Sequence, residues 1–187
     1  DRLLEHVLSF SLKPNALPAG IGILNPFEGA HGTEVRRIVT EFHRNHFTDT
    51  RPRLVMLGIN PGRLGAGSTG LPFTDTKRCE SDLAIRVSGI RTHEPSSDFF
   101  YRMIRAAGGA RSFYGQVYVH SICPLGFVRQ GTMGKEVNLN YYDDPTLEKA
   151  VTPFVEHWLR TLIACGMRTE SVFCLGTGKN AAYFTKL

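Results

Sequence analysis

The chain has 187 residues, of which 42% are hydrophobic and 21% are charged, which is typical of one globular domain with a substantial core. No apolar run reaches the roughly 18 residues of a membrane span, and the formal net charge of +5 suits a polyanionic partner. The four cysteines form no C-x-x-C pair, so we expect no metal site and a reduced, intracellular protein.

Helical and strand patterns alternate along the chain. In chain order they predict a helix over 2–11, a loop over 12–32, a helix over 33–47 with Thr33 as its N-cap, a strand over 53–59, a glycine-rich loop, a weak helix over 79–87, a helix over 96–109 capped by Ser96 or Ser97, a strand over 117–122, a polar loop over 126–143, a long helix over 143–166, a strand over 171–176 and a helix from near Thr177.

The predicted strands are apolar on both faces, as in parallel strands that are covered by helices on each side. The fold class is therefore predicted to be α/β, a three-layer α/β/α arrangement with a short central parallel sheet. Ligands of such sheets bind beyond the carboxyl ends of the strands. Those ends are residues 58–60 and 121–123, which we expect to share one edge.

The most unusual stretch is GINPGRLGAGSTGLPF, residues 58–73, and it has three interpretations. Residues 65–70 match the dinucleotide pattern G-x-G-x-x-G, but they do not directly follow the strand, and no lysine completes a phosphate-binding P-loop. A solvated turn explains Asn-Pro-Gly but not the length of the stretch. The third is a base pocket, in which Asn60 presents a fixed amide and Phe73 stacks on a flat ring.

Two segments here resemble a known family. Residues 58–62 and 69–73 are similar to the first motif of the single-strand-selective monofunctional uracil-DNA glycosylases, in the uracil-DNA glycosylase superfamily. Residues 123–125 are similar to the segment that carries the family's base-recognition residue, and 137–140 to an Asn-Leu stretch that follows it. The resemblance covers about 55–185 and points to a divergent bacterial-type branch.

The resemblance implies a DNA repair enzyme that flips uracil out of DNA, hydrolyses its N-glycosidic bond and leaves an abasic site, without a cofactor. Asn60 matches the catalytic asparagine that orients the attacking water, and Phe73 matches the stacking aromatic residue. The other matching substrate-binding positions are Gly58, Ile59, Pro61, Gly62, Gly70 and Ser121.

Ser121 stands where the family usually carries asparagine. One hydroxyl cannot accept from uracil N3–H and donate to O4 as an amide does. We therefore expect relaxed base choice, with xanthine or hypoxanthine accepted besides uracil. The alternative is that Ser121 is a plain strand-end residue whose hydroxyl bonds the backbone.

The family also has a late His-Pro motif, and no histidine follows His157. We expect residues 1–187 to form one glycosylase-like domain without the C-terminal strand and His-Pro loop, which binds DNA but cleaves it poorly. A non-catalytic damaged-DNA or nucleotide-binding α/β module remains the alternative. We expect an intracellular monomer without a membrane association, either cytoplasmic or bound to DNA. The candidates for contacts with DNA phosphates are Arg63, Lys77, Arg78, Arg129 and Lys135.

Overall fold

A computed structural model describes residues 2–13, 16–131, 134–176 and 178–186. The elements, in chain order, are α1 (Arg2–Leu8), β1 (Ile21–Leu24), α2 (Gly32–His46), β2 (Leu54–Gly58), α3 (Ala66–Thr69), α4 (Thr76–Ser81), α5 (Pro95–Ala106), α6 (Ala110–Tyr114), β3 (Val117–Ser121), β4 (Gly126–Gln130), β5 (Glu136–Leu139), α7 (Pro145–Ala164), β6 (Val172–Cys174) and α8 (Lys179–Phe184). No helix among the described residues is long and apolar enough to cross a bilayer.

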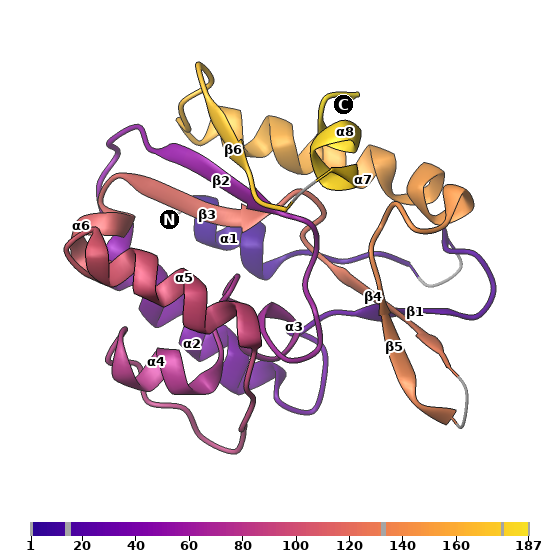
Figure 1. Ribbon diagram of the computed structural model, residues 1–187, viewed down its shortest axis with the longest axis horizontal. Helices are drawn as coiled ribbons and strands as arrows, with labels where there is room; N and C mark the ends of the chain where they lie inside the picture. Colours follow the sequence, from indigo (N-terminus) through magenta and orange to yellow (C-terminus); the bar gives the residue numbers. More distant parts are fainter. Residues whose placement is uncertain (1, 14–15, 132–133, 177, 187) are drawn as a thin grey trace.

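The central sheet is parallel, with the strand order β3-β2-β6 (Figure 1). All five residues of β3 are buried, as the apolar pattern of this strand predicts. Helices α7 and α8 lie on one side of the sheet in Figure 1, and α2, α4 and α5 lie on the other. The predicted α/β class with a short parallel sheet flanked by helices is therefore confirmed.

A second sheet was not expected from the sequence. Strands β1, β4 and β5 form an antiparallel sheet in the order β1-β4-β5, with Ile21 opposite Arg129. The predictions of loops over 12–32 and 126–143 are therefore wrong in these parts. Three of the four β5 residues are exposed and two are polar, so the segment has no continuous apolar run, and its pairing is decided by chain segments far apart in sequence. In Figure 1 this sheet lies beyond the carboxyl end of β3.

The helix boundaries also differ from the predictions at several caps. The N-cap of α5 is Glu94, not Ser96 or Ser97, and that of α2 is His31, not Thr33. The weak helix expected over 79–87 is the earlier α4, capped by the Asp75 side chain. Thr177 lies outside the described residues, and α8 begins at Lys179.

Helix α7 closes the core on one side of the sheet. Its N-cap Asp144 accepts hydrogen bonds from the backbone N–H groups of Thr146 and Leu147, at 2.8 and 3.1 Å. Pro145 occupies the first turn, as predicted, where no N–H is required. The indole of Trp158 is 1% exposed and packs edge-on against Phe10, with 4.9 Å between ring centroids.

Candidate active site

A cavity of about 210 Å³ lies where β2 and β3 end. Gly58 and Ser121, the last residues of these strands, are paired in register, and the N–H of Ile122 donates to the Gly58 carbonyl at 2.9 Å. The predicted shared edge therefore exists. The residues that line the cavity are Gly58, Ile59, Asn60, Pro61, Gly62, Ala66, Pro72, Phe73, Glu94, Ser121, Asn140, Leu175 and Gly176.

The Asn60 side chain is held by the backbone at the end of β5 and just after it. Its Nδ2 donates to the carbonyl of Leu139 at 3.1 Å and, more weakly, to that of Pro61 at 3.3 Å. Its Oδ1 accepts from the N–H of Tyr141 at 3.0 Å. These partners fix which end of the amide is the oxygen. Because an amide oxygen has two lone pairs, Oδ1 retains the capacity to accept one more hydrogen bond.

Phe73 lies against the tip of β2. Its ring stacks on Phe100, with 4.8 Å between centroids and 22° between planes, so one face is already supported. A Cβ atom at Gly58 would come within 2.8 Å of Phe73 Cζ, so only glycine lets the ring approach the strand this closely. Phe73 has a φ of 54°, an uncommon backbone conformation for a bulky residue. Such strain persists where the surroundings hold it, which is frequent at functional sites.

Ser121 is 4% exposed and lines the cavity. Its carbonyl accepts from Trp158 Nε1 at 3.1 Å, which fixes the backbone here. No hydrogen bond joins its hydroxyl to any residue that the structure describes, so the predicted alternative of a backbone-bonded hydroxyl finds no support.

His120, the neighbour of Ser121, is not a second polar group of the site. Its ring packs among Phe10, Tyr118 and Trp158 on the other face of β3. Burial lowers the pKa of His120 to about 3, so the ring is neutral at ordinary pH. It cannot provide a positive charge beside a departing base.

Gly70 is a predicted substrate-binding residue that the structure places elsewhere. It ends α3 with a left-handed φ of 73° and packs against Val35 and Val39 of α2, and it does not line the cavity. Its role here is to close a turn that a β-carbon would strain.

Glu94 and Asn140 line the cavity but were missed as site residues. Both lie in irregular segments just outside a helix or strand, so no periodic pattern identifies them. Asn140 belongs to the Asn-Leu stretch noted in the sequence. Glu94 stands in a polar loop, and no sequence signal indicates that its side chain turns inward.

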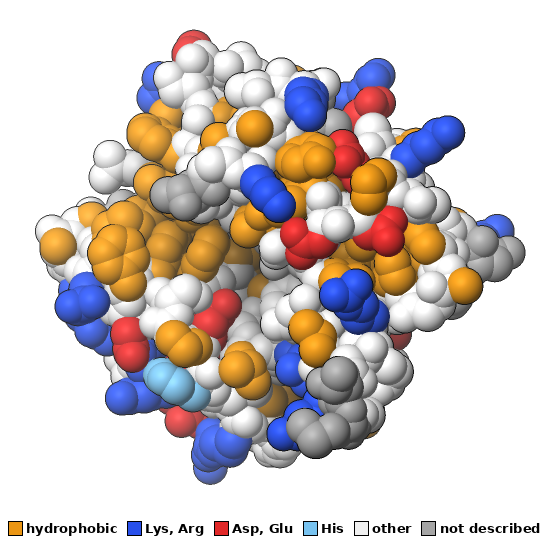
Figure 2. Space-filling view, turned by 45° about the vertical axis from the view of Figure 1, so that its right-hand side comes forward, with side chains coloured by type: hydrophobic (Ala, Val, Ile, Leu, Met, Phe, Trp, Pro, Cys, Tyr) orange, Lys and Arg blue, Asp and Glu red, His pale blue; other side chains and the backbone are white. Residues whose placement is uncertain are grey.

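Most of the candidate phosphate contacts are exposed. Arg63 lies beside the cavity and bonds Asn138 through Nε at 3.2 Å, whereas Arg129 and Lys135 belong to the antiparallel sheet and its turn. The prediction that Arg78 contacts a DNA phosphate is wrong, because Arg78 is only 4% exposed and pairs with Asp98. On the face of the molecule drawn in Figure 2, the Lys and Arg side chains stand apart, with acidic and uncharged groups between them.

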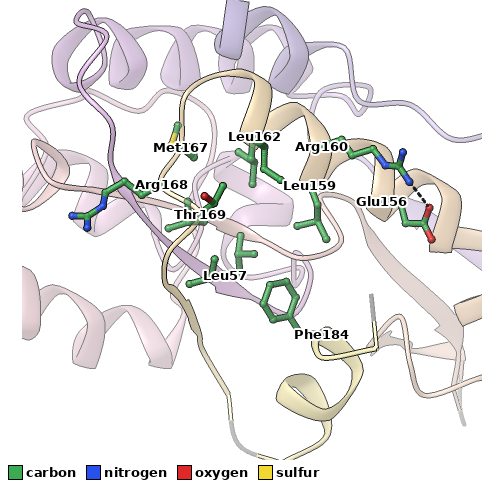
Figure 3. Close-up of a pocket in the computed structure, with 12 residues that line it drawn as sticks. Leu57, Glu156, Leu159, Arg160, Leu162, Met167, Arg168, Thr169 and Phe184 are labelled. Carbon is green, nitrogen blue, oxygen red and sulfur yellow. Dashed lines mark ion pairs between the residues drawn. The ribbon is translucent and has the colours of Figure 1, made fainter.

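A second hollow, of about 360 Å³, lies between α7 and the strands. Its walls include Leu57, Leu159, Leu162 and Phe184 (Figure 3). The ion pair of Glu156 with Arg160 runs along α7, with 3.5 Å between charged atoms. Most of its wall is apolar, but Glu156, Arg160, Arg168 and Thr169 also line it, whereas the predicted site residues Asn60, Phe73 and Ser121 do not. Among the described residues, no group of three or more His, Cys, Asp or Glu side chains could hold a metal ion.

Comparison with known proteins shows the family of this chain. The family model of the uracil DNA glycosylase superfamily matches residues 45–186. The chain is similar to the crystal structure of wild-type Pedobacter heparinus SMUG2, with 45% sequence identity and a TM-score of 0.94, covering 100% of this chain and 79% of that one. No curated protein sequence matches it. The chain belongs to the uracil-DNA glycosylase superfamily and is a monofunctional uracil-DNA glycosylase of base excision repair, a hydrolase that acts on DNA.

Proposed function

We propose that this enzyme binds the flipped base in the cavity at the tips of β2 and β3 and that Asn60 orients the water that replaces it. The observation that carries the proposal is the amide of Asn60, fixed by Leu139 and Tyr141, in a cavity that Phe73 and Ser121 also line. A flat ring of pyrimidine size fits against Phe73, and its polar edge meets Ser121.

The chemistry needs little from the water-binding residue. The glycosidic bond breaks before the water adds, so the sugar becomes an oxocarbenium-like cation that a weakly activated water captures. A neutral amide oxygen is a poor base, but its free lone pair accepts a hydrogen bond from that water and holds it in line. The enzyme's main contribution is position, which the backbone contacts of Asn60 supply.

The experiment that tests the proposal uses a single-stranded oligonucleotide with one uracil. The protein is incubated with it, and alkali then breaks the strand at each abasic site. We expect breakage that depends on Asn60. Binding without breakage would support the alternative of a damaged-DNA-binding module, and breakage that survives loss of Asn60 would refute its assigned role.

Base choice is predicted to depend on Ser121. We propose that its single hydroxyl reads one group of the base and therefore admits xanthine and hypoxanthine. Replacing Ser121 with Asn should raise the ratio of kcat/KM for uracil to that for xanthine about tenfold or more, because an amide adds a second directional hydrogen bond. Rates on single-stranded uracil and xanthine oligonucleotides measure this ratio. An unchanged ratio would show that Ser121 does not select the base.

A further inference from the structure

Glu94 is the one carboxyl group that lines the base cavity among the described residues. It occupies the N-cap position of α5, yet its side chain makes no capping hydrogen bond. Its Oε2 is buried and has no hydrogen-bond partner in the described structure. A buried acceptor without a partner is costly, so its position calls for a ligand that supplies the missing donor.

The surrounding residues hold Glu94 in the cavity. The carboxylate of Asp75 accepts from the backbone N–H of Glu94 at 3.1 Å and from Ser97 Oγ at 2.9 Å. Because Asp75 follows Phe73 by two residues, its hydrogen bond to Glu94 connects the segment that carries the stacking ring with the loop that carries Glu94. A Cβ at Gly65 would overlap the Glu94 carboxyl group, so glycine there makes room for it.

We propose that Glu94 is a base-recognition residue whose buried carboxyl oxygen accepts a hydrogen bond from the ring N–H that deamination creates. This inference rests on the proposed binding of the base in this cavity. Cytosine N3 and adenine N1 are acceptors with lone pairs, whereas uracil N3 and hypoxanthine N1 each carry a hydrogen. A fixed acceptor pairs with the deaminated ring and repels the lone pair of its parent.

The carboxyl can accept in either protonation state. Burial raises the pKa of Glu94 above its ordinary value, a side-chain hydrogen bond with Ser96 partly offsets this increase, and the nearby negative charge of Asp75 adds to it. Protonation occupies one oxygen only and leaves the other free to accept. Acceptance of the ring N–H therefore does not require an ionised group, whereas rejection of the parent base does, because a protonated carboxyl donates to the lone pair of cytosine N3 or adenine N1.

The test combines a change at residue 94 of the enzyme with a change at N3 of the base and compares their effects on kcat/KM. Wild type and Glu94→Ala each act on single-stranded oligonucleotides with uracil or N3-methyluracil, which lacks the ring N–H. In wild type we expect the methyl group to lower kcat/KM about 10- to 100-fold, as loss of a hydrogen bond to an acidic group does. In Glu94→Ala the penalty should fall to about threefold or less. Glu94→Gln, which keeps a carbonyl acceptor, should restore it.

Glu80→Ala is the matched control, because Glu80 is exposed and does not line the cavity. It should leave the methyl penalty unchanged. If Glu94→Ala lowers the rates on both substrates equally, Glu94 has only a structural role and the inference is wrong. If wild type excises uracil but Asn60 is dispensable, the proposed site itself fails, and the inference fails with it for that separate reason.

Discussion

Replacing Asn60 with Ala is expected to lower kcat for uracil excision by about 10²- to 10³-fold, the usual cost of removing one preorganised polar group from an active site. The amide that holds the water is lost, while Phe73 and Ser121 still line the cavity. KM should change less than kcat, because Asn60 is assigned to the water and not to the base. Single-turnover rates on a uracil oligonucleotide measure the loss.

The structural role of Asn60 requires a control. Its amide also ties down the backbone at Leu139 and Tyr141, so the melting temperature of Asn60→Ala must be compared with that of wild type. Asn45→Ala is the matched variant, because Asn45 is exposed on α2, away from the cavity. It should keep full activity. A folded Asn60→Ala protein with a kcat within about threefold of wild type would contradict the assigned role.

Replacing Trp158 with Ala is expected to lower the free energy of unfolding by about 3–5 kcal/mol, the range for removing a large buried aromatic side chain. The substitution empties a space between Phe10 and His120 and removes the donor to the Ser121 carbonyl. The same change therefore loosens the backbone at the cavity.

Urea unfolding followed by fluorescence loses its probe in this variant, because Trp158 is the only tryptophan, so far-ultraviolet circular dichroism is the suitable signal. Phe99→Ala serves as the control, because Phe99 is 68% exposed on α5 and its loss should cost no more than about 0.5 kcal/mol. A loss below about 1 kcal/mol for Trp158→Ala would show that α7 contributes little to the core.

The parallel sheet and the part of the site that contains Asn60 and Phe73 were predictable, because the sequence patterns that indicate them are local. Strands β2 and β3 are short apolar runs that end in glycine or serine, and parallel strands bring such ends together. Asn60 and Phe73 were then recognised from their positions after the first of these strands. Their inclusion in one cavity agrees with the predicted base pocket.

The remaining features depend on contacts between distant segments. Strand β1 pairs with β4 across more than a hundred residues, and neither segment shows a strong strand pattern alone. Glu94 reaches the cavity because Asp75, in another loop, binds its backbone. Such placements follow from tertiary packing, which overrides local preference.

The central claim is that the uracil ring occupies the cavity at the strand tips. The most direct measurement is a crystal structure of the wild-type protein with a single-stranded oligonucleotide that carries 2′-fluoro-2′-deoxyuridine, whose electron-withdrawing fluorine resists formation of the sugar cation. We expect the ring against Phe73, with its polar edge toward Ser121 and Glu94. A ring bound outside this cavity, for example in the apolar hollow beside Leu159 and Phe184, would contradict the account.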